Sequence, residues 1–163
     1  MSLSDRRTFL TIMAAGLAAG CGFAPVYGPG GTGAALRGRV DVAGPDTRQD
    51  FVLVARFEER LGRATTPIYR LDYSTSVTST GVGITGADDV TRANLAGSLD
   101  YVLSDRATGA TVVSGQVSTF TAYSTTGSPV ATRAARRDAE DRLMVALADQ
   151  TVSQLLVRAP SGS

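Results

Sequence analysis

The sequence predicts an α+β domain, a two-layer sandwich in which two helices cover one face of a four-stranded sheet in the order β-α-β-β-β-α. Three patterns lead to this prediction. Apolar and polar residues alternate with a period of two between residues 67 and 123, which is typical of strands with one buried face. Apolar residues recur at helical spacing before this region, over 47–61, and again after it, over 129–158. Amphipathic helices that flank a sheet in sequence need an apolar sheet face to pack on, which favours two layers.

The composition excludes several functions. The chain has 163 residues, a length that fits one domain. Its 16 basic and 15 acidic side chains nearly cancel, so it lacks the basic excess that attracts nucleic acid. It contains no His and one Cys, which removes the commonest general base, a disulfide framework and a Cys-rich metal site. We therefore expect no catalytic residue, no metal site, no cofactor and no nucleic-acid partner.

Two acidic pairs, Glu58-Glu59 and Asp88-Asp89, are the remaining candidates for acid–base chemistry. Neighbouring residues on a helix point apart, so Glu58 and Glu59 are not expected to share a proton. Asp88 and Asp89 fall in an expected turn, where aspartate commonly bonds the backbone; cation binding is the alternative. Because no His is present to activate a serine, we expect that the protein is not an enzyme.

The N-terminal residues 1–20 have the pattern of a signal peptide. A short charged segment precedes an apolar run over residues 9–19, which is shorter than the about 20 residues that span a bilayer. Two small residues then precede Cys21, as in a bacterial lipobox, where the thiol receives a diacylglycerol and the signal is cleaved in front of it. We expect Cys21 to become the acylated first residue; an ordinary buried Cys is the alternative. Gly22 after it favours the outer membrane.

The chain after the signal divides into three parts. Residues 21–35 are rich in Gly and Pro, and we expect a flexible tether there. Residues 36–158 form the expected domain. Residues 159–163 are expected to be a disordered tail. The alternating pattern over Ala35–Val42 predicts that a first strand begins the domain.

The expected first helix covers residues 47–61. Asp46 is its predicted N-cap, and Gln49 completes a capping box. Gly62 is expected to end the helix. The apolar residues taken to form its buried stripe are Phe51, Val54, Ala55 and Leu61.

Three strands follow as a meander. In the first, Tyr69, Leu71, Tyr73, Thr75 and Val77 are expected to face inward. In the second, the inward residues are Ala93, Leu95, Gly97, Leu99, Tyr101 and Leu103. A turn is expected over 81–89, and a hairpin at Gly109, which can adopt a positive φ. The third strand has less distinct faces, because Val113 and Val117 share one face and Phe120 lies on the other.

The long C-terminal helix is predicted to begin after Ser128 as N-cap, with Pro129 at its first position, and to run to Arg158. Its expected buried stripe is Ala139, Leu143, Met144, Leu147, Thr151, Val152 and Leu155.

The start of the expected mature chain is similar to a known family. A lipobox Cys, the motif "CGFAPVYG" and the order of elements that follows resemble the lipopolysaccharide-assembly lipoprotein LptE family of alphaproteobacterial type. The residues that match the motif are Cys21, Gly22, Phe23, Pro25, Tyr27 and Gly28. This resemblance implies a lipoprotein of the outer membrane that plugs the lumen of the β-barrel LptD, helps that barrel to assemble, and takes part in lipopolysaccharide transport.

The resemblance also indicates which side chains are candidates for contacts. A plug in a polar lumen needs a polar surface, and the outward sheet positions carry Ser, Thr, Asp and Arg, with few charges of one sign. Lipid A phosphates are bound best by arginine. The candidates for phosphate or barrel contacts are Arg37, Arg39, Arg70, Arg92 and Arg106. A solvated surface arginine is the alternative for each. For the whole protein, the alternatives are a periplasmic adapter or ligand-binding lipoprotein of another envelope transporter, and a purely structural lipoprotein.

Overall fold

The computed structural model describes Gly28 and residues 31–84 and 90–160. The expected signal peptide, Cys21, most of the expected tether, the turn at 85–89 and the last three residues lie outside the described residues. The predictions made for those segments therefore stay predictions.

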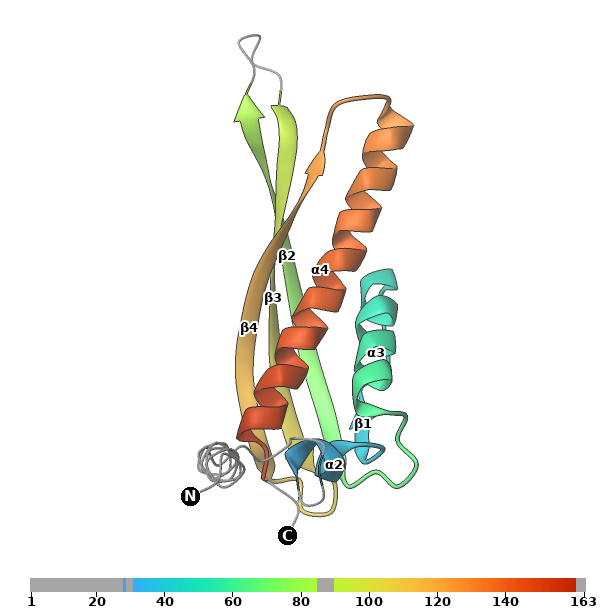
Figure 1. Ribbon diagram of the computed structural model, residues 1–163, viewed down its shortest axis with the longest axis vertical. Helices are drawn as coiled ribbons and strands as arrows, with labels where there is room; N and C mark the ends of the chain where they lie inside the picture. Colours follow the sequence, from blue (N-terminus) through green and yellow to red (C-terminus); the bar gives the residue numbers. More distant parts are fainter. Residues whose placement is uncertain (1–27, 29–30, 85–89, 161–163) are drawn as a thin grey trace, which may run out of the picture.

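The predicted fold class is confirmed. A four-stranded sheet has the order β1-β2-β3-β4, with β1 (Val40–Val42), β2 (Tyr69–Ile84), β3 (Val90–Asp105) and β4 (Thr111–Ser124). The short strand β1 pairs parallel with the start of β2, and the other neighbours are antiparallel. Helix α4 (Pro129–Arg158) lies along β4 and β3, and α3 (Arg48–Leu61) lies beside α4. Figure 1 shows an elongated molecule with both helices on one side of the sheet.

The hydrophobic core lies between the sheet and the helices. The predicted period-two assignment of β2 and β3 is confirmed, because their inward residues are buried or half-buried and the residues between them are mostly exposed. The largest fully buried side chains are Leu36, Leu53, Phe57, Leu71, Leu95, Leu99, Tyr101, Leu103, Leu143, Met144, Leu147 and Leu155. At about 25 cal/mol per Å² of apolar area removed from water, this burial supplies most of the driving force for folding.

Helix α4 begins and ends where the sequence predicts. The Ser128 side chain accepts a hydrogen bond from the Ala131 N–H, and Pro129 occupies the first turn. All seven residues of the predicted stripe are buried, and Ala148 joins them. The helix approaches the sheet closely at Gly97, where a Cβ would lie 2.9 Å from Leu143 Cδ2.

Helix α3 has the predicted span but a different cap and a different buried face. Thr47, not Asp46, is the N-cap, and it forms a capping box with Asp50. The buried apolar residues are Leu53, Phe57 and Leu61, so of the predicted stripe only Leu61 is correct. Phe51 is 63% exposed. The reason is that α3 packs against both the sheet and α4, and this double contact selects a face that spacing alone did not identify.

The segment predicted as the first strand is wrong in its first half. Thr32–Leu36 form the short helix α2, in which Gly33 and Leu36 are buried, and the strand covers only Val40–Val42. The packed domain therefore begins before the predicted boundary at residue 36. At the other end, Ala159 is 6% exposed and joins the core, so the expected tail does not begin at residue 159.

The predicted turn at 81–89 is also too long. Strand β2 continues to Ile84 and β3 begins at Val90, with Ile84 paired with Val90. The hairpin at Gly109 is confirmed, with φ of +72° at that glycine. The Asp105 side chain accepts hydrogen bonds from the Thr108 and Ala107 N–H groups, and these bonds lower the pKa of its carboxyl, which stabilises the turn.

Candidate functional site: the outer face of the sheet

The face of the sheet turned away from the helices, called here the outer face, is uncovered in the part of the chain that the structure describes. It is built by the side chains between the buried ones on β2, β3 and β4. Its residues are Arg70, Asp72, Ser74, Ser76, Thr78, Thr80, Arg92, Asn94, Ala96, Ser98, Asp100, Val102, Ser104, Ser114, Gln116, Ser118, Phe120, Ala122 and Ser124. The two arginines and two aspartates among them balance, so the face is formally neutral.

The centre of the outer face consists of rows of small hydrogen-bonding side chains. Ser76, Ser98 and Ser118 lie opposite one another across the three strands. In the next row Thr78 lies opposite Ala96, and Ala96 lies opposite Phe120. These two rows line a shallow hollow. Hydroxyls both donate and accept hydrogen bonds, so this surface can bind a polar partner without removing a charge from water.

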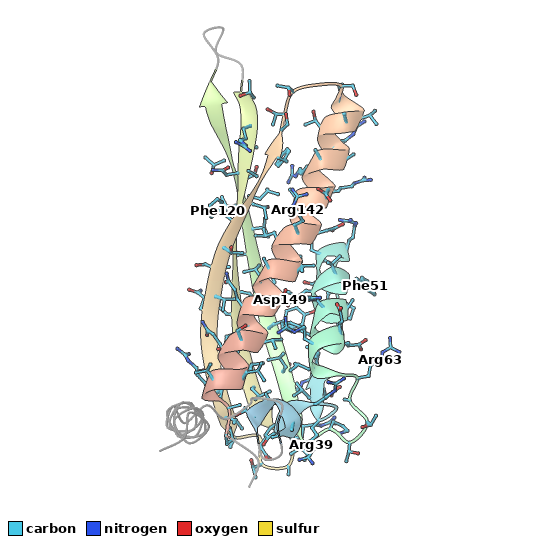
Figure 2. The ribbon with its side chains drawn as sticks, viewed as in Figure 1. Arg39, Phe51, Arg63, Phe120, Arg142 and Asp149 are labelled. Atoms are coloured by element: carbon cyan, nitrogen blue, oxygen red, sulfur yellow. The ribbon has the colours of Figure 1, made fainter. Side chains whose placement is uncertain are left out.

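Phe120 is the apolar exception on this surface. Phe120, labelled in Figure 2, is 71% exposed, because its cross-strand neighbour Ala96 is too small to cover the ring. An aromatic side chain surrounded by neutral polar groups is typical of a contact residue in protein interfaces. The prediction that Phe120 lies on the opposite face from Val113 and Val117 is confirmed, but its role as a candidate contact was not predicted. The signal in the sequence was an aromatic residue in the set of alternate strand positions that otherwise faces outward and is mostly polar.

The charges at one end of the outer face are paired with one another. Arg106 donates to Asp41 at 3.0 Å, and Arg70 lies 3.8 Å from the same carboxylate. Arg70 also donates to Asp72 at 3.0 Å. Near the middle, the Gln116 amide donates to Asp100 at 2.8 Å. The structure therefore brings Arg70 and Arg106 together, but around an aspartate of this chain.

The other candidate arginines lie apart. Arg37 is the C-cap of α2, not a strand residue as predicted. Arg39 directly precedes β1 and lies at the lower end in Figure 2. Arg92 lies at the opposite end of the sheet, between Val82 and Ser124. Within the described residues these three side chains have no ion pair. The five predicted residues therefore do not form one cluster.

A second charged cluster joins the two helices. Asp149 of α4 accepts two hydrogen bonds from Arg56, each 2.9 Å, and one from Arg60 at 2.8 Å. Figure 2 shows Asp149 on the side of α4 that faces α3. The bonds from Arg56 and Arg60 hold the pKa of the Asp149 carboxyl below its ordinary value. This cluster fixes α3 against α4 and is turned away from the outer face.

Neither acidic pair considered for acid–base chemistry is seen as two carboxylates that share a proton. Glu58 accepts from Arg63 and Glu59 accepts from Arg56, each in a different ion pair. Asp88 and Asp89 lie outside the described residues. Over the described ranges, no group of three or more His, Cys, Asp or Glu side chains is placed to hold a metal ion. A helix with the length and apolar character needed to cross a membrane was not found in those ranges.

The comparisons with known proteins support the fold. No protein-family model matches the sequence, and no curated protein matches it by sequence. Among solved structures, the chain is similar to a candidate lipoprotein from Caulobacter crescentus CB15, with 22% identity, 77% of this chain and 93% of that chain covered, and a TM-score of 0.64.

Two further structures share the arrangement. The rare lipoprotein B from Shewanella oneidensis has a TM-score of 0.57 at 8% identity, with 73% of this chain and 92% of that chain covered. A minor lipoprotein from Acinetobacter baumannii has a TM-score of 0.54 at 14% identity, with 77% and 94% covered. At these identities the likeness concerns the fold, because one fold can carry different functions.

Proposed function

We propose that this chain is a lipoprotein of the outer membrane that sits as a plug in a large β-barrel, of the LptD kind, and takes part in lipopolysaccharide transport to the cell surface. The observation that carries this proposal is the outer face, a long, neutral, hydrogen-bonding surface that the described part of the chain leaves uncovered. Support also comes from the lipobox-like Cys21 and from the fold shared with three bacterial lipoproteins.

The shape of the domain fits such a lumen. Strands of 16 residues extend roughly 50 Å, and the 30 residues of α4 extend about 45 Å. The apolar band of an outer-membrane barrel is about 25 Å tall, and its interior is polar. A domain of this length can contact the lumen along its whole height. Neutral hydroxyls suit this contact, because burying an unpaired charge costs several kcal/mol.

The unpaired arginines are the candidates for lipopolysaccharide. Arg37, Arg39 and Arg92 have no ion pair within the described residues, so their guanidinium groups are available for phosphate, which arginine binds in a bidentate manner. Arg70 and Arg106 would first have to leave Asp41. We therefore place phosphate contacts at the first three positions in preference to the other two.

The test is recovery of the partner from membranes. The full-length protein is extracted in mild detergent and the proteins recovered with it are identified by mass spectrometry, which also reports whether Cys21 is the acylated N-terminus. We expect one large barrel protein in a stoichiometric complex. Recovery of an inner-membrane transporter instead would favour the adapter alternative, and an unacylated product with another N-terminus would contradict the anchor.

A pair of variants tests the surface. Ser98→Arg places a charge in the central serine row, and we expect at least a tenfold loss of the barrel. Ser153→Arg adds the same charge on the exposed side of α4 and should leave recovery unchanged. Depletion of the protein should lower both surface lipopolysaccharide and mature barrel; normal levels of both would contradict the proposal.

A further inference from the structure

The free edges of the long strands β2 and β4 differ in whether they carry features that prevent pairing with a further strand. The edge of β4 is interrupted by an irregularity in its register with β3 at Leu103 and Ser104. In addition, the Arg142 guanidinium reaches the Ala122 carbonyl at 3.4 Å. Bulges and charged side chains are the usual means by which proteins prevent an exposed edge from pairing with another chain. The β4 edge carries both.

The edge of β2 is open above β1. Strand β1 pairs with only Tyr69–Leu71, and within the described residues no strand lies on that side of β2 further on. The Tyr69 N–H donates to the Arg39 carbonyl and the Leu71 carbonyl accepts from Ala43, so odd-numbered residues of β2 point their backbone groups to this side. Because the direction alternates along a strand, the N–H and C=O groups of Thr75, Val77 and Ser79 also point to it.

Nothing in this edge prevents pairing. From Ser74 to Gly81 the sequence has no charged residue and no proline, and apart from Val77 and Gly81 it consists of Ser and Thr. Its register with β3 is continuous. Helix α3 accompanies only the lower part of β2, whereas α4 extends much further along the sheet (Figure 1). An open, neutral edge without protective features is a template for an additional strand.

We propose that the β2 edge from Thr75 to Gly81 binds an extended segment of a partner polypeptide, which adds to the sheet as a further strand. The chemistry of the occupant follows from the edge, which offers backbone donors and acceptors at strand spacing and side chains without charge. The occupant is therefore a peptide backbone with neutral side chains. Its identity rests on the proposed function, in which the barrel's own chain is the polypeptide that surrounds this edge.

The test uses two matched proline variants of the full-length protein. Ser79→Pro removes an exposed-edge N–H from β2 and leaves the ladder with β3 intact, since that N–H is not part of it. Ser114→Pro does the same on the free edge of β4, and both serines are exposed. We expect Ser79→Pro to lower the amount of barrel recovered in mild detergent at least tenfold, and Ser114→Pro to change it less than twofold.

The outcomes separate this inference from the proposed function. Equal recovery of the barrel with both variants would overturn strand addition and leave the plug intact. Recovery of a different protein that is lost with Ser79→Pro would support strand addition and contradict the barrel. Recovery of no partner would overturn the inference. A wild-type dimer in light scattering that Ser79→Pro dissociates would also overturn it, because the strand added to β2 would then come from a second copy of this chain.

A measurement on the wild-type protein covers the case in which a proline variant does not fold. Amide hydrogen exchange is compared between the free protein and its complex in the same detergent. We expect slower exchange in the complex for peptides that cover residues 73–81, and little change for peptides that cover residues 114–122. Unchanged exchange over 73–81 would overturn the inference.

Discussion

The inner and outer faces of the sheet are made by alternating residues of the same three strands, and they have opposite properties. On β3, Leu95, Leu99 and Leu103 are fully buried under the helices. The residues between them include Ser98 and Asp100 on the outer face, which the described helices do not cover. A shift of one residue in register would exchange the two sets completely. Stability and binding are therefore assigned to different residues within each strand, and substitutions can test them separately.

The largest expected effect concerns the centre of the inner face. Leu99→Ala removes a side chain that is fully buried, and such truncations lower the free energy of unfolding by about 2–5 kcal/mol because they lose apolar burial and leave a cavity. Urea denaturation followed by circular dichroism measures this. The neighbouring Ser98→Ala on the outer face should stay within about 0.5 kcal/mol of wild type. Similar losses for both variants would contradict the separation of the faces.

The next effect concerns the close approach of α4 to the sheet. Gly97→Ala adds a Cβ that would lie 2.9 Å from Leu143 Cδ2 and 3.2 Å from Leu147 Cδ1. Because the fully buried side chains of Leu143 and Leu147 must shift to admit it, we expect a loss of about 1–3 kcal/mol in the free energy of unfolding. Gly44→Ala is the control, since nothing lies within 4 Å of its added Cβ. A stability of Gly97→Ala equal to that of Gly44→Ala would show that α4 does not press on this glycine.

The elements that the sequence predicted correctly are those with strong local signals. The alternation in β2 and β3 determined which face is buried, and Ser128 and Pro129 defined the start of α4. The stripe of α3 could not be predicted from spacing, because Phe51 and Phe57 are equally apolar and only contact with α4 and the sheet distinguishes them. The bounds of the short strand β1 were predicted incorrectly for a similar reason, because the strand conformation of its three residues depends on pairing with β2.

The sequence predicted the polar character of the outer face, but not which of its residues are free to bind a partner. The polar residues at alternate positions of the strands indicate, from the sequence alone, a polar face that carries hydroxyls and few charges of one sign. The pairing of Arg106 with Asp41 joins residues that are 65 positions apart in sequence, so the availability of each arginine could not be judged from its type. The open edge of β2 could likewise not be predicted from the sequence, because it depends on β1 pairing with only three residues of β2.

A smaller effect depends on pH and lies in the helical layer behind the inner face. Asp149→Asn removes the carboxylate that accepts from Arg56 and Arg60, and we expect a loss of about 1 kcal/mol at pH 7. The pKa of Asp149 is lowered in the folded protein, so its contribution is present above the unfolded value of about 3.9 and disappears as pH falls through the folded value. Denaturation at pH 7, 5 and 3 should show the difference between wild type and variant persisting at pH 5 and shrinking at pH 3.

The exposed ion pair of Asp138 with Arg142 provides the control for this pH dependence. Both side chains are more than half exposed, so Asp138→Asn should change the free energy of unfolding by less than about 0.5 kcal/mol at each pH. A difference for Asp149→Asn that stayed constant between pH 7 and pH 3 would contradict the role of the ionised carboxylate.

The smallest effect on stability is expected on the outer face itself, where the effect on binding should be largest. Phe120→Ser replaces a side chain that is 71% exposed, so the free energy of unfolding should remain within about 0.5 kcal/mol of wild type. Recovery of the membrane partner should fall several-fold, because an aromatic side chain at the centre of an interface commonly contributes more than its neighbours. Phe51→Ser is the matched control, since Phe51 is 63% exposed on α3 and distant from the outer face. If both variants recover the partner equally well, Phe120 is a solvated side chain and the contact surface lies elsewhere.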